Sequence, residues 1–469
     1  MELNPAFSAQ MAKILPPEEL TDFMTSLQET ASVSVRINGR KCPDSALDGG
    51  DMVPWCERGM YLSERAGFIF DPLWHAGAYY VQDASSMIIQ TIIQRLALPQ
   101  DTGLRYLDLC AAPGGKTTAA IDALPDGTLV VANEIMSARA QVLKENLIKW
   151  GYNRCIVTSD DSARFSALRG YFDIIAADVP CSGEGMFRKD EEAVSQWTPS
   201  LVDECVQRQL SIVRNAWSAL RDGGIFIYST CTYNRLEDEQ MVEHICKELG
   251  AESIAMDFPT EWNIHPSIDT PHHCYRFMPH CTRGEGLFVC VLRKAGDSPH
   301  ADTELPSKKK SARSGKAKMP ITPVPKSAKA LTAIPLDLSI EADEIYGIEK
   351  SISGDVQYLA DSLNVIYKGI HIGSLKGKDI IPSTALALSI LPLSDDLPVV
   401  DVDYTNAVAY LRGESISIDA PKGFCVINYK GFRLGFVKNL GNRANNLYPK
   451  QWRIKSTHIP ETPPHVLSL

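Results

Sequence analysis

The sequence predicts an α/β protein built around a doubly wound, mostly parallel sheet. Between residues 97 and 295, short apolar runs alternate with segments of helical pattern, as in folds of this class. Most of these runs end in small or polar residues, which is typical of the ligand-binding edge of such a sheet. The chain has 469 residues, of which 44% are hydrophobic and 22% charged, so we expect a soluble protein of several domains.

Five apolar runs of strand length form the predicted sheet. They are RYLDL (105–109), TLVVANE (128–134), RCIVTSDD (154–161), FDIIAADVP (172–180) and GGIFIYSTC (223–231). A helix is predicted over 137–150, and a longer one from the cap at Thr198 and Pro199 to the glycines at 223 and 224. Two further strands are indicated by CYRFMPH (274–280) and EGLFVCVLRK (285–294).

The rest of the chain divides by composition. We expect an N-terminal element over 1–95, with a short strand at SVSVRIN, before the sheet domain at 96–295. Residues 296–333 are rich in Lys, Ser, Ala and Pro and predict a linker, since they bury too little apolar surface to fold alone. Two small β-rich modules are expected at 334–396 and 397–469.

Composition also limits the location of the protein. The longest apolar stretch, 380–393, is too short and too broken for a membrane span, and the first residues lack the pattern of a secretory signal. Twelve cysteines without a CxxC pair predict reduced thiols. We therefore expect a cytoplasmic protein without a membrane partner, and a monomer is favoured, although the sequence leaves the oligomeric state open.

Positive charge is concentrated near the C-terminus. The net charge is −10, yet residues 421–455 contain eight Lys or Arg and no Asp or Glu. Six aromatic residues are interleaved with these cations, and most of the rings are expected in the core of a small β domain. A basic surface attracts phosphate groups, so this segment predicts an RNA contact. The cations chosen as RNA contacts are Lys430, Arg433, Lys438 and Arg443.

A turn of small residues follows the first predicted strand. LDLCAAPGGKT (107–117) lacks the GxGxxG pattern of dinucleotide binders, and Cys110 occupies the place of the first P-loop glycine. Such a turn lets a ligand approach the backbone at the strand end. The candidate ligand contacts here are Cys110, Ala111, Ala112, Pro113, Gly114, Gly115 and Lys116.

Acidic residues follow at the next strand ends. Glu134 is placed to accept hydrogen bonds from both ribose hydroxyls of a nucleoside, Asp161 lies where an adenine amino group would sit, and Asp178 closes the fourth strand. Any one of these acids alone would more often be a helix cap or a solvated turn. Together they indicate a nucleoside-containing cofactor.

Two cysteines lie just beyond adjacent strands on the same edge of the sheet. Cys181 belongs to DVPCSGEGMFRKD (178–190) and Cys231 to YSTCTYNRLEDE (228–239). A thiolate is a strong nucleophile, and Cys231 directly precedes a segment of helical pattern (232–249) whose dipole would favour the ionised form. Arg188 and Lys189 are candidate RNA or active-site contacts, or simply part of a solvated loop.

These motifs resemble the Sun-domain (Fmu/nucleolar-protein) family of RNA cytosine-5 methyltransferases, and most closely its bacterial small-subunit ribosomal RNA methyltransferase F type. The resemblance extends over essentially the whole chain and includes SVRIN (34–38), PLWHAGAYYVQDASSM (72–87) and PHCTRGEGLFV (279–289). It implies a Rossmann-like class I methyltransferase sheet, an N-terminal α/β RNA-binding element and a C-terminal PUA-like module. The two-cysteine arrangement is specific, since DNA cytosine-5 methyltransferases use a single cysteine.

The resemblance also implies roles for the candidate residues. Cys231 would attack carbon 6 of a cytosine in small-subunit ribosomal RNA or an assembling subunit, and Cys181 would assist release of the adduct. Asp178 would hydrogen-bond the pyrimidine, while residues 110–116, Glu134, Asp161 and Asp178 would contact S-adenosylmethionine.

Several alternatives stay open. The adenine contact is either Asp161 or its neighbour Asp160. The RNA substrate could instead be a transfer RNA. A third alternative is a ribosome-assembly factor that binds RNA without catalysis. The cluster HHCYRFMPHC (272–281) has zinc-type ligands but lacks a second half, so no metal is expected.

Overall fold

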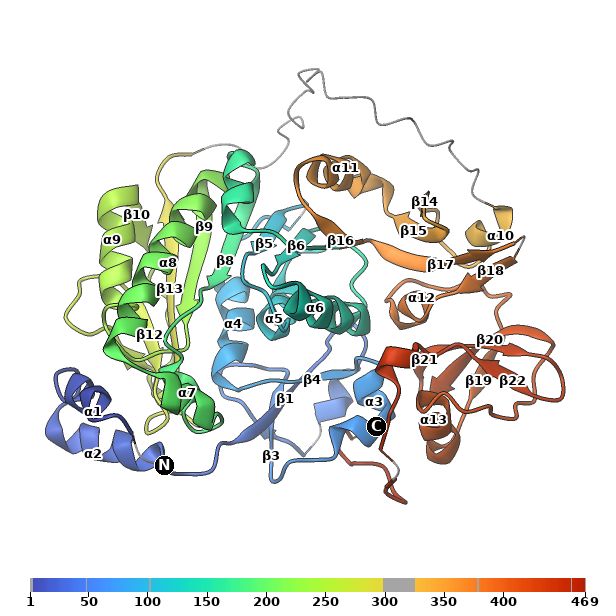
Figure 1. Cartoon of the computed structure of the whole chain (residues 1–469), viewed down its shortest axis with the longest axis horizontal. Helices are drawn as coiled ribbons and strands as arrows, with labels where there is room; N and C mark the ends of the chain where they lie inside the picture. Colours follow the sequence, from blue (N-terminus) through green and yellow to red (C-terminus); the bar gives the residue numbers. More distant parts are fainter. Residues whose placement is uncertain are drawn as a thin grey trace.

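The computed structural model describes residues 3–47, 49–100, 103–297, 325–377, 379–456 and 458–468 (Figure 1). The predicted linker at 296–333 lies largely outside these ranges. Within them, no helix is both long and apolar enough to cross a membrane.

The N-terminal part combines two helices with a small antiparallel sheet. Its helices are α1 (Pro5–Met11) and α2 (Pro17–Ser26), and its strands, in the order β2-β3-β1-β4, are β1 (Val33–Ile37), β2 (Asp51–Met52), β3 (Gly59–Leu62) and β4 (Tyr79–Val81). The short helix α3 (Pro72–His75) precedes β4, and α4 (Ile88–Arg95) leads into the central domain. The apolar side of α4 packs beside the first helix of that domain in the main core.

The central domain confirms the predicted doubly wound sheet. Its strand order is β11-β12-β13-β9-β8-β5-β6-β7-β16, in which β16 is Val365–Lys368, and the pairs within β5 to β9 are parallel. The strands are β5 (Arg105–Asp108), β6 (Leu129–Asn133), β7 (Cys155–Thr158), β8 (Phe172–Asp178), β9 (Leu220–Thr230), β10 (Ala251–Ser253), β11 (His265–Pro266), β12 (Cys274–Phe277) and β13 (Leu287–Lys294). Apolar cores on both faces bury β5, β6 and β7 completely, which explains their continuous hydrophobic runs.

Helices cover both faces of this sheet. They are α5 (Gly115–Ala123), α6 (Ser137–Trp150), α8 (Pro199–Ala219) and α9 (Glu239–Leu249), whereas the short α7 (Glu191–Gln196) packs in the same apolar cluster as α1 and α2. The predicted start of α8 is confirmed, since the Thr198 hydroxyl accepts a hydrogen bond from the Leu201 amide at 3.1 Å. Its end differs: the helix stops at Ala219, and the glycines at 223 and 224 lie inside β9.

The two C-terminal β-rich parts lie side by side along one flank of the central domain (Figure 1). The first has the strand order β14-β15-β17-β18, with β14 (Asp337–Glu341), β15 (Glu344–Ile348), β17 (Ile370–Lys376) and β18 (Asp379–Pro382). Its helices are α10 (Lys326–Lys329), α11 (Ser353–Ser362) and α12 (Thr384–Leu388). The second contains β19 (Val399–Asp401), α13 (Tyr404–Leu411), β20 (Gly423–Tyr429), β21 (Phe432–Asn439) and β22 (Ala444–Asn446).

One strand of the first C-terminal part belongs to the central sheet. β16 (Val365–Lys368) pairs antiparallel with β7, and so extends that sheet at its edge. Next to it, the Asn364 backbone amide donates to the Asp160 carboxylate at 2.6 Å. The C-terminal region therefore reaches the strand end that was predicted to bind a cofactor.

Candidate active site

The carboxyl ends of β5 to β9 surround a cavity of about 660 Å³. Its walls combine acidic, sulfur-containing and apolar side chains. They include Cys110, Ala112, Glu134, Ile135, Asp160, Asp161, Asp178, Cys181, Arg208, Ile212 and Cys231. The volume lies in the range of about 300–1,000 Å³ that is usual for small-molecule sites. Residues predicted from separate motifs thus share one cavity.

The turn at 110–116 forms one side of this cavity and begins α5. Gly114 has φ of +110°, a conformation that L side chains rarely adopt, and a Cβ there would also lie 3.2 Å from Leu143. Cys110 and Ala112 line the cavity, whereas Ala111 is buried. Pro113 turns its carbonyl to Asn146 instead. Of the seven predicted contacts in this turn, the structure therefore places two at the cavity wall and Lys116 close to it, through Asp178.

Glu134 closes β6 and is almost fully buried at the cavity wall. One carboxylate oxygen accepts a hydrogen bond from the Met136 amide at 2.9 Å, and the other lies 3.4 Å from the Arg139 guanidinium. A carboxylate has about four lone-pair sites, so it can still accept ribose hydroxyls.

Both candidate adenine contacts line the cavity, each with a structural hydrogen bond. Asp161 caps the following 3₁₀ helix by accepting from the Ala163 amide at 2.8 Å, and Asp160 accepts from Asn364. Asn133 was not predicted. Its side chain donates to the carbonyls of Leu109 and Asp160 and accepts from the Asp160 amide. Its position next to Glu134 in TLVVANE was the available signal. The carboxylate acceptors and the small-residue turn suit a nucleoside-containing cofactor.

Asp178 lies in the part of the cavity that is lined by Cys181 and Cys231. One oxygen accepts from the Ser229 hydroxyl at 2.8 Å, and the other lies 2.9 Å from the Lys116 ammonium. Burial disfavours the charged form of Lys116, but attraction to Asp178 outweighs it and raises the pKa of this ammonium. Lys116 is therefore a fixed cation that orients Asp178. Ser229 was not predicted, although it lies in the same YSTC motif as Cys231.

The sulfur atoms of Cys181 and Cys231 lie 3.3 Å apart. The hydrogen bond to Cys231, followed by burial, raises the pKa of the Cys181 thiol well above its ordinary value. Cys181 therefore stays protonated and can donate to the Cys231 sulfur.

The loops that carry the two cysteines are joined by a buried polar network. Glu237 accepts from the Ser182 amide at 3.0 Å, from Gln209 at 2.7 Å and from Asn234 at 2.7 Å. These contacts fix the backbone next to Cys181. Glu237 was not predicted, and the acidic run LEDE was its only signal in the sequence.

The predicted helix-dipole effect on Cys231 is wrong. Helix α9 begins at Glu239, eight residues after the cysteine, because residues 232–238 form an irregular segment held by the Glu237 network. The dipole falls off within the first turn of a helix, so it does not reach this sulfur.

Arg188 and Lys189, the candidate RNA or active-site contacts, both form ion pairs within the protein. Arg188 is buried and donates to the Glu285 carboxylate at 2.9 Å, and Lys189 lies 3.5 Å from the same group. Arg188 therefore joins the loop after Cys181 to the turn before β13, and it is neither a solvated residue nor an exposed RNA contact.

The potential zinc ligands at 272–281 are divided by the fold. His273 is exposed, Cys274 is buried in β12, and His280 and Cys281 lie close to Glu19 of α2. Glu19 accepts from His280 at 3.0 Å, which accounts for this grouping without a metal. The expectation that the chain uses no metal stays a prediction.

The basic segment 421–455 contains strands β20, β21 and β22 of the second C-terminal part. Tyr429, Phe432, Phe436 and Tyr448 are buried, as expected for core rings, while Phe424 and Trp452 are partly exposed. Lys430 and Arg443 are exposed, and Lys438 is half-buried, 3.8 Å from Asp379. Arg433 differs, because its guanidinium donates to the backbone carbonyls of Ser389 and Leu391. We therefore leave Arg433 out of the RNA-contact set.

Three family models match successive parts of the chain. Residues 95–293 match "16S rRNA methyltransferase RsmB/F", residues 3–84 match the N-terminal domain of 16S rRNA methyltransferase RsmF, and residues 397–454 match the PUA domain of methyltransferase RsmF. Ribosomal RNA small subunit methyltransferase F of Shewanella loihica is 28% identical, covering 96% of this chain and 95% of its own. The protein of the same name from Aeromonas salmonicida is 29% identical, covering 95% and 96%.

Solved structures agree on the fold. A methyltransferase homologue from Pyrococcus horikoshii has a TM-score of 0.54 at 22% identity, and covers 62% of this chain and 95% of its own. NSun6 from the same organism, solved with SFG, has a TM-score of 0.53 at 18% identity, with 62% and 98% covered.

Proposed function

Because the chain belongs to the 16S rRNA methyltransferase RsmB/F family, we propose that it methylates carbon 5 of a cytosine in small-subunit ribosomal RNA through a covalent bond from Cys231. S-adenosylmethionine is the cofactor and supplies the methyl group. The observation that carries the cytosine-5 assignment is the contact between Cys181 and Cys231, next to Asp178 at the cofactor cavity. Twelve free cysteines suit our placement of the enzyme in the cytoplasm.

In this mechanism, the Cys231 sulfur forms a bond to carbon 6 of the cytosine. The added electron density makes carbon 5 nucleophilic enough to accept the methyl group. The proton on carbon 5 then passes to water, and the electron pair of that bond restores the double bond between carbons 5 and 6. The bond from sulfur to carbon 6 breaks at the same time, and its electron pair returns to the Cys231 sulfur. Cys181, whose sulfur lies 3.3 Å from that of Cys231, assists this last step.

Asp178 orients the base in the same mechanism. Lys116 and Ser229 hold its two oxygens, so it presents a fixed acceptor to the pyrimidine edge without reorganisation during the reaction. Residues on three successive strand ends, Glu134, Asp161 and Asp178, would contact the cofactor. Asp160 is the alternative adenine contact, although its carboxylate already accepts the Asn364 amide.

Bisulfite sequencing separates this proposal from its alternatives. We expect 16S ribosomal RNA from a strain without the gene to lose one 5-methylcytosine, and a plasmid copy to restore it. Loss in a transfer RNA would favour the first alternative. Unchanged methylation with defective subunit assembly would favour a non-catalytic assembly factor, which the complete set of Asp178, Cys181 and Cys231 argues against.

We expect Glu134→Ala to weaken S-adenosylmethionine binding by about 1.5–3 kcal/mol, the scale of a hydrogen bond to a charged group. The buried carboxylate at the end of β6 is placed for the ribose hydroxyls. Titration calorimetry measures this change, and Glu134→Gln, which keeps one acceptor, should fall in between. Wild-type affinity in the alanine variant would mean that Glu134 only supports the first turn of α6.

Joint replacement of Lys430, Lys438 and Arg443 by alanine should weaken RNA binding and flatten its salt dependence. Each lost phosphate contact should reduce the log–log slope by about 0.7 for single-stranded RNA. Filter binding from low to high salt measures both effects. Arg433→Ala is the matched control: we expect a lower melting temperature and an unchanged slope, because its hydrogen bonds end on backbone carbonyls. An unchanged slope in the triple variant would exclude this face as the RNA contact.

A further inference from the structure

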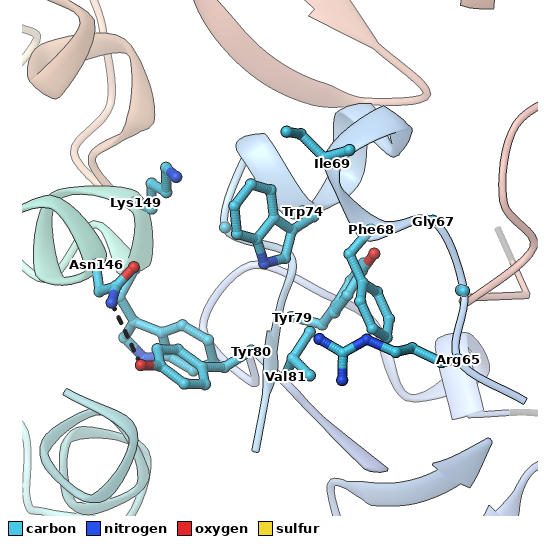
Figure 2. A pocket seen from close by; sticks show the side chains of 13 residues that line it. Arg65, Gly67, Phe68, Ile69, Trp74, Tyr79, Tyr80, Val81, Asn146 and Lys149 are labelled. Carbon is cyan, nitrogen blue, oxygen red and sulfur yellow. Dashed lines mark hydrogen bonds between the residues drawn. The ribbon is translucent and has the colours of Figure 1, made fainter. Parts of the chain in front are cut away.

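A second cavity, of about 470 Å³, lies outside the active site, between the N-terminal sheet and the last turns of α6. We call it the aromatic pocket and define it by Arg65, Phe68, Trp74, Tyr80 and Asn146. Figure 2 shows Trp74 and Tyr80 on one side of it and Phe68 with Arg65 on the other. Aromatic rings in the lining of a cavity of this size offer apolar surface on which a flat ligand can pack.

Trp74 is held in place before any ligand binds. The Lys149 ammonium lies 4.2 Å from the centre of its ring and 5.6 Å from that of Trp452, and it also pairs with Glu145 at 2.8 Å. The Lys149 ammonium is thus already paired within the protein, and its contact with the ring holds the Trp74 indole in place. A ring that is already ordered loses little conformational entropy when a ligand stacks on it.

Polar groups beside the rings offer recognition of a base edge. The Asn146 amide nitrogen donates to the Pro113 carbonyl at 2.8 Å and to the Tyr80 hydroxyl at 3.3 Å. Within the described part of the chain, no donor reaches the amide oxygen of Asn146, which leaves it as an acceptor for an amino group. Pro113 belongs to the turn at 110–116, so the aromatic pocket lies directly behind the cofactor turn.

The rim of the pocket carries a cation for a phosphate. Arg65 is exposed, its guanidinium lies 6.0 Å from the centre of the Phe68 ring, and none of the carboxylates in the described ranges comes within 4.0 Å of it. Aromatic rings with an arginine at the edge are the usual means of binding unstacked bases of single-stranded RNA.

We propose that the aromatic pocket binds an unpaired base of the RNA substrate, other than the methylated cytosine, with the attached phosphate toward Arg65. The proposal rests on the proposed function for its RNA substrate. Because the aromatic pocket lies behind the cofactor turn, a base bound there would fix the RNA strand relative to the reacting cytosine.

The test compares Trp74→Leu with Trp262→Leu, a matched control that removes another partly exposed indole, stacked on Arg95 away from the pocket. Trp74→Leu should weaken binding of a 16S ribosomal RNA fragment about tenfold, on the scale of one lost base–ring stack. Trp262→Leu should bind normally, and both variants should keep wild-type affinity for S-adenosylmethionine. Arg65→Ala, at an exposed position, provides a second variant that should fold normally, bind RNA more weakly and show a flatter salt slope.

A photocrosslink locates the base directly. RNA fragments carrying 4-thiouridine at single unpaired positions should crosslink within residues 65–81 or 146–150 of the wild-type protein, and not in Trp74→Leu. Unchanged RNA affinity in both Trp74→Leu and Arg65→Ala, or crosslinks only elsewhere, would overturn the proposal, as would binding of a peptide or free metabolite that RNA does not displace. Wild-type methylation measured in parallel distinguishes this failure from failure of the proposed function.

Discussion

Replacing Cys231 by alanine is expected to abolish methyl transfer to RNA while S-adenosylmethionine binding stays at the wild-type level. Removing a covalent nucleophile usually costs about 10⁴-fold or more in rate, because the reaction then lacks its low-energy route. Cys231 lies at the cavity wall, but the acidic contacts proposed for the cofactor come from other strand ends. Transfer of a labelled methyl group measures the rate, and calorimetry measures cofactor binding.

Cys246→Ala is the control for this variant. Cys246 is a half-buried free cysteine on α9, away from the cavity, and its replacement should leave the rate nearly unchanged. Substantial turnover by Cys231→Ala would remove Cys231 from the nucleophile role. It would also reopen the choice between the two sulfur atoms that lie 3.3 Å apart.

The second large effect is expected from Cys181→Ala, which should trap the RNA on the protein. If Cys181 assists the release step, its loss lets Cys231 attack and carbon 5 accept the methyl group, but leaves the bond from sulfur to carbon 6 in place. The result is a protein–RNA adduct that survives denaturant and migrates as a retarded band. The close contact of the two sulfurs and the protonated state of Cys181 give this role its physical basis.

The double variant Cys181→Ala/Cys231→Ala tests which sulfur forms the adduct. We expect no retarded band, because the nucleophile is then absent. Cys181→Ser, which keeps a hydrogen-bond donor of similar size, should accumulate less adduct than Cys181→Ala. An adduct that persists in the double variant, or none in the single variant, contradicts the assignment.

Local sequence patterns were sufficient for the central fold and for the composition of the site. The apolar runs that became β5 to β9 are buried on both faces of a parallel sheet, which makes them continuous and recognisable. Strand ends in such a sheet share one edge, so the sequence alone predicted that Glu134, Asp178 and the two cysteines would meet. All four line one cavity.

The tertiary structure decided what depends on partners far apart in the chain. A β-rich module was expected at 334–396, but nothing local shows that its strand at 365–368 pairs with β7, some 200 residues earlier. Likewise, the charge of Arg433 suggested RNA, whereas its hydrogen bonds join two modules. The sequence by itself therefore determined the central strands, the ligand-binding edge and its chemistry, because hydrophobic periodicity and the residue types at strand ends are local properties. Pairing, burial and the partner of each charge arise only when distant segments pack, and the fold alone decided them.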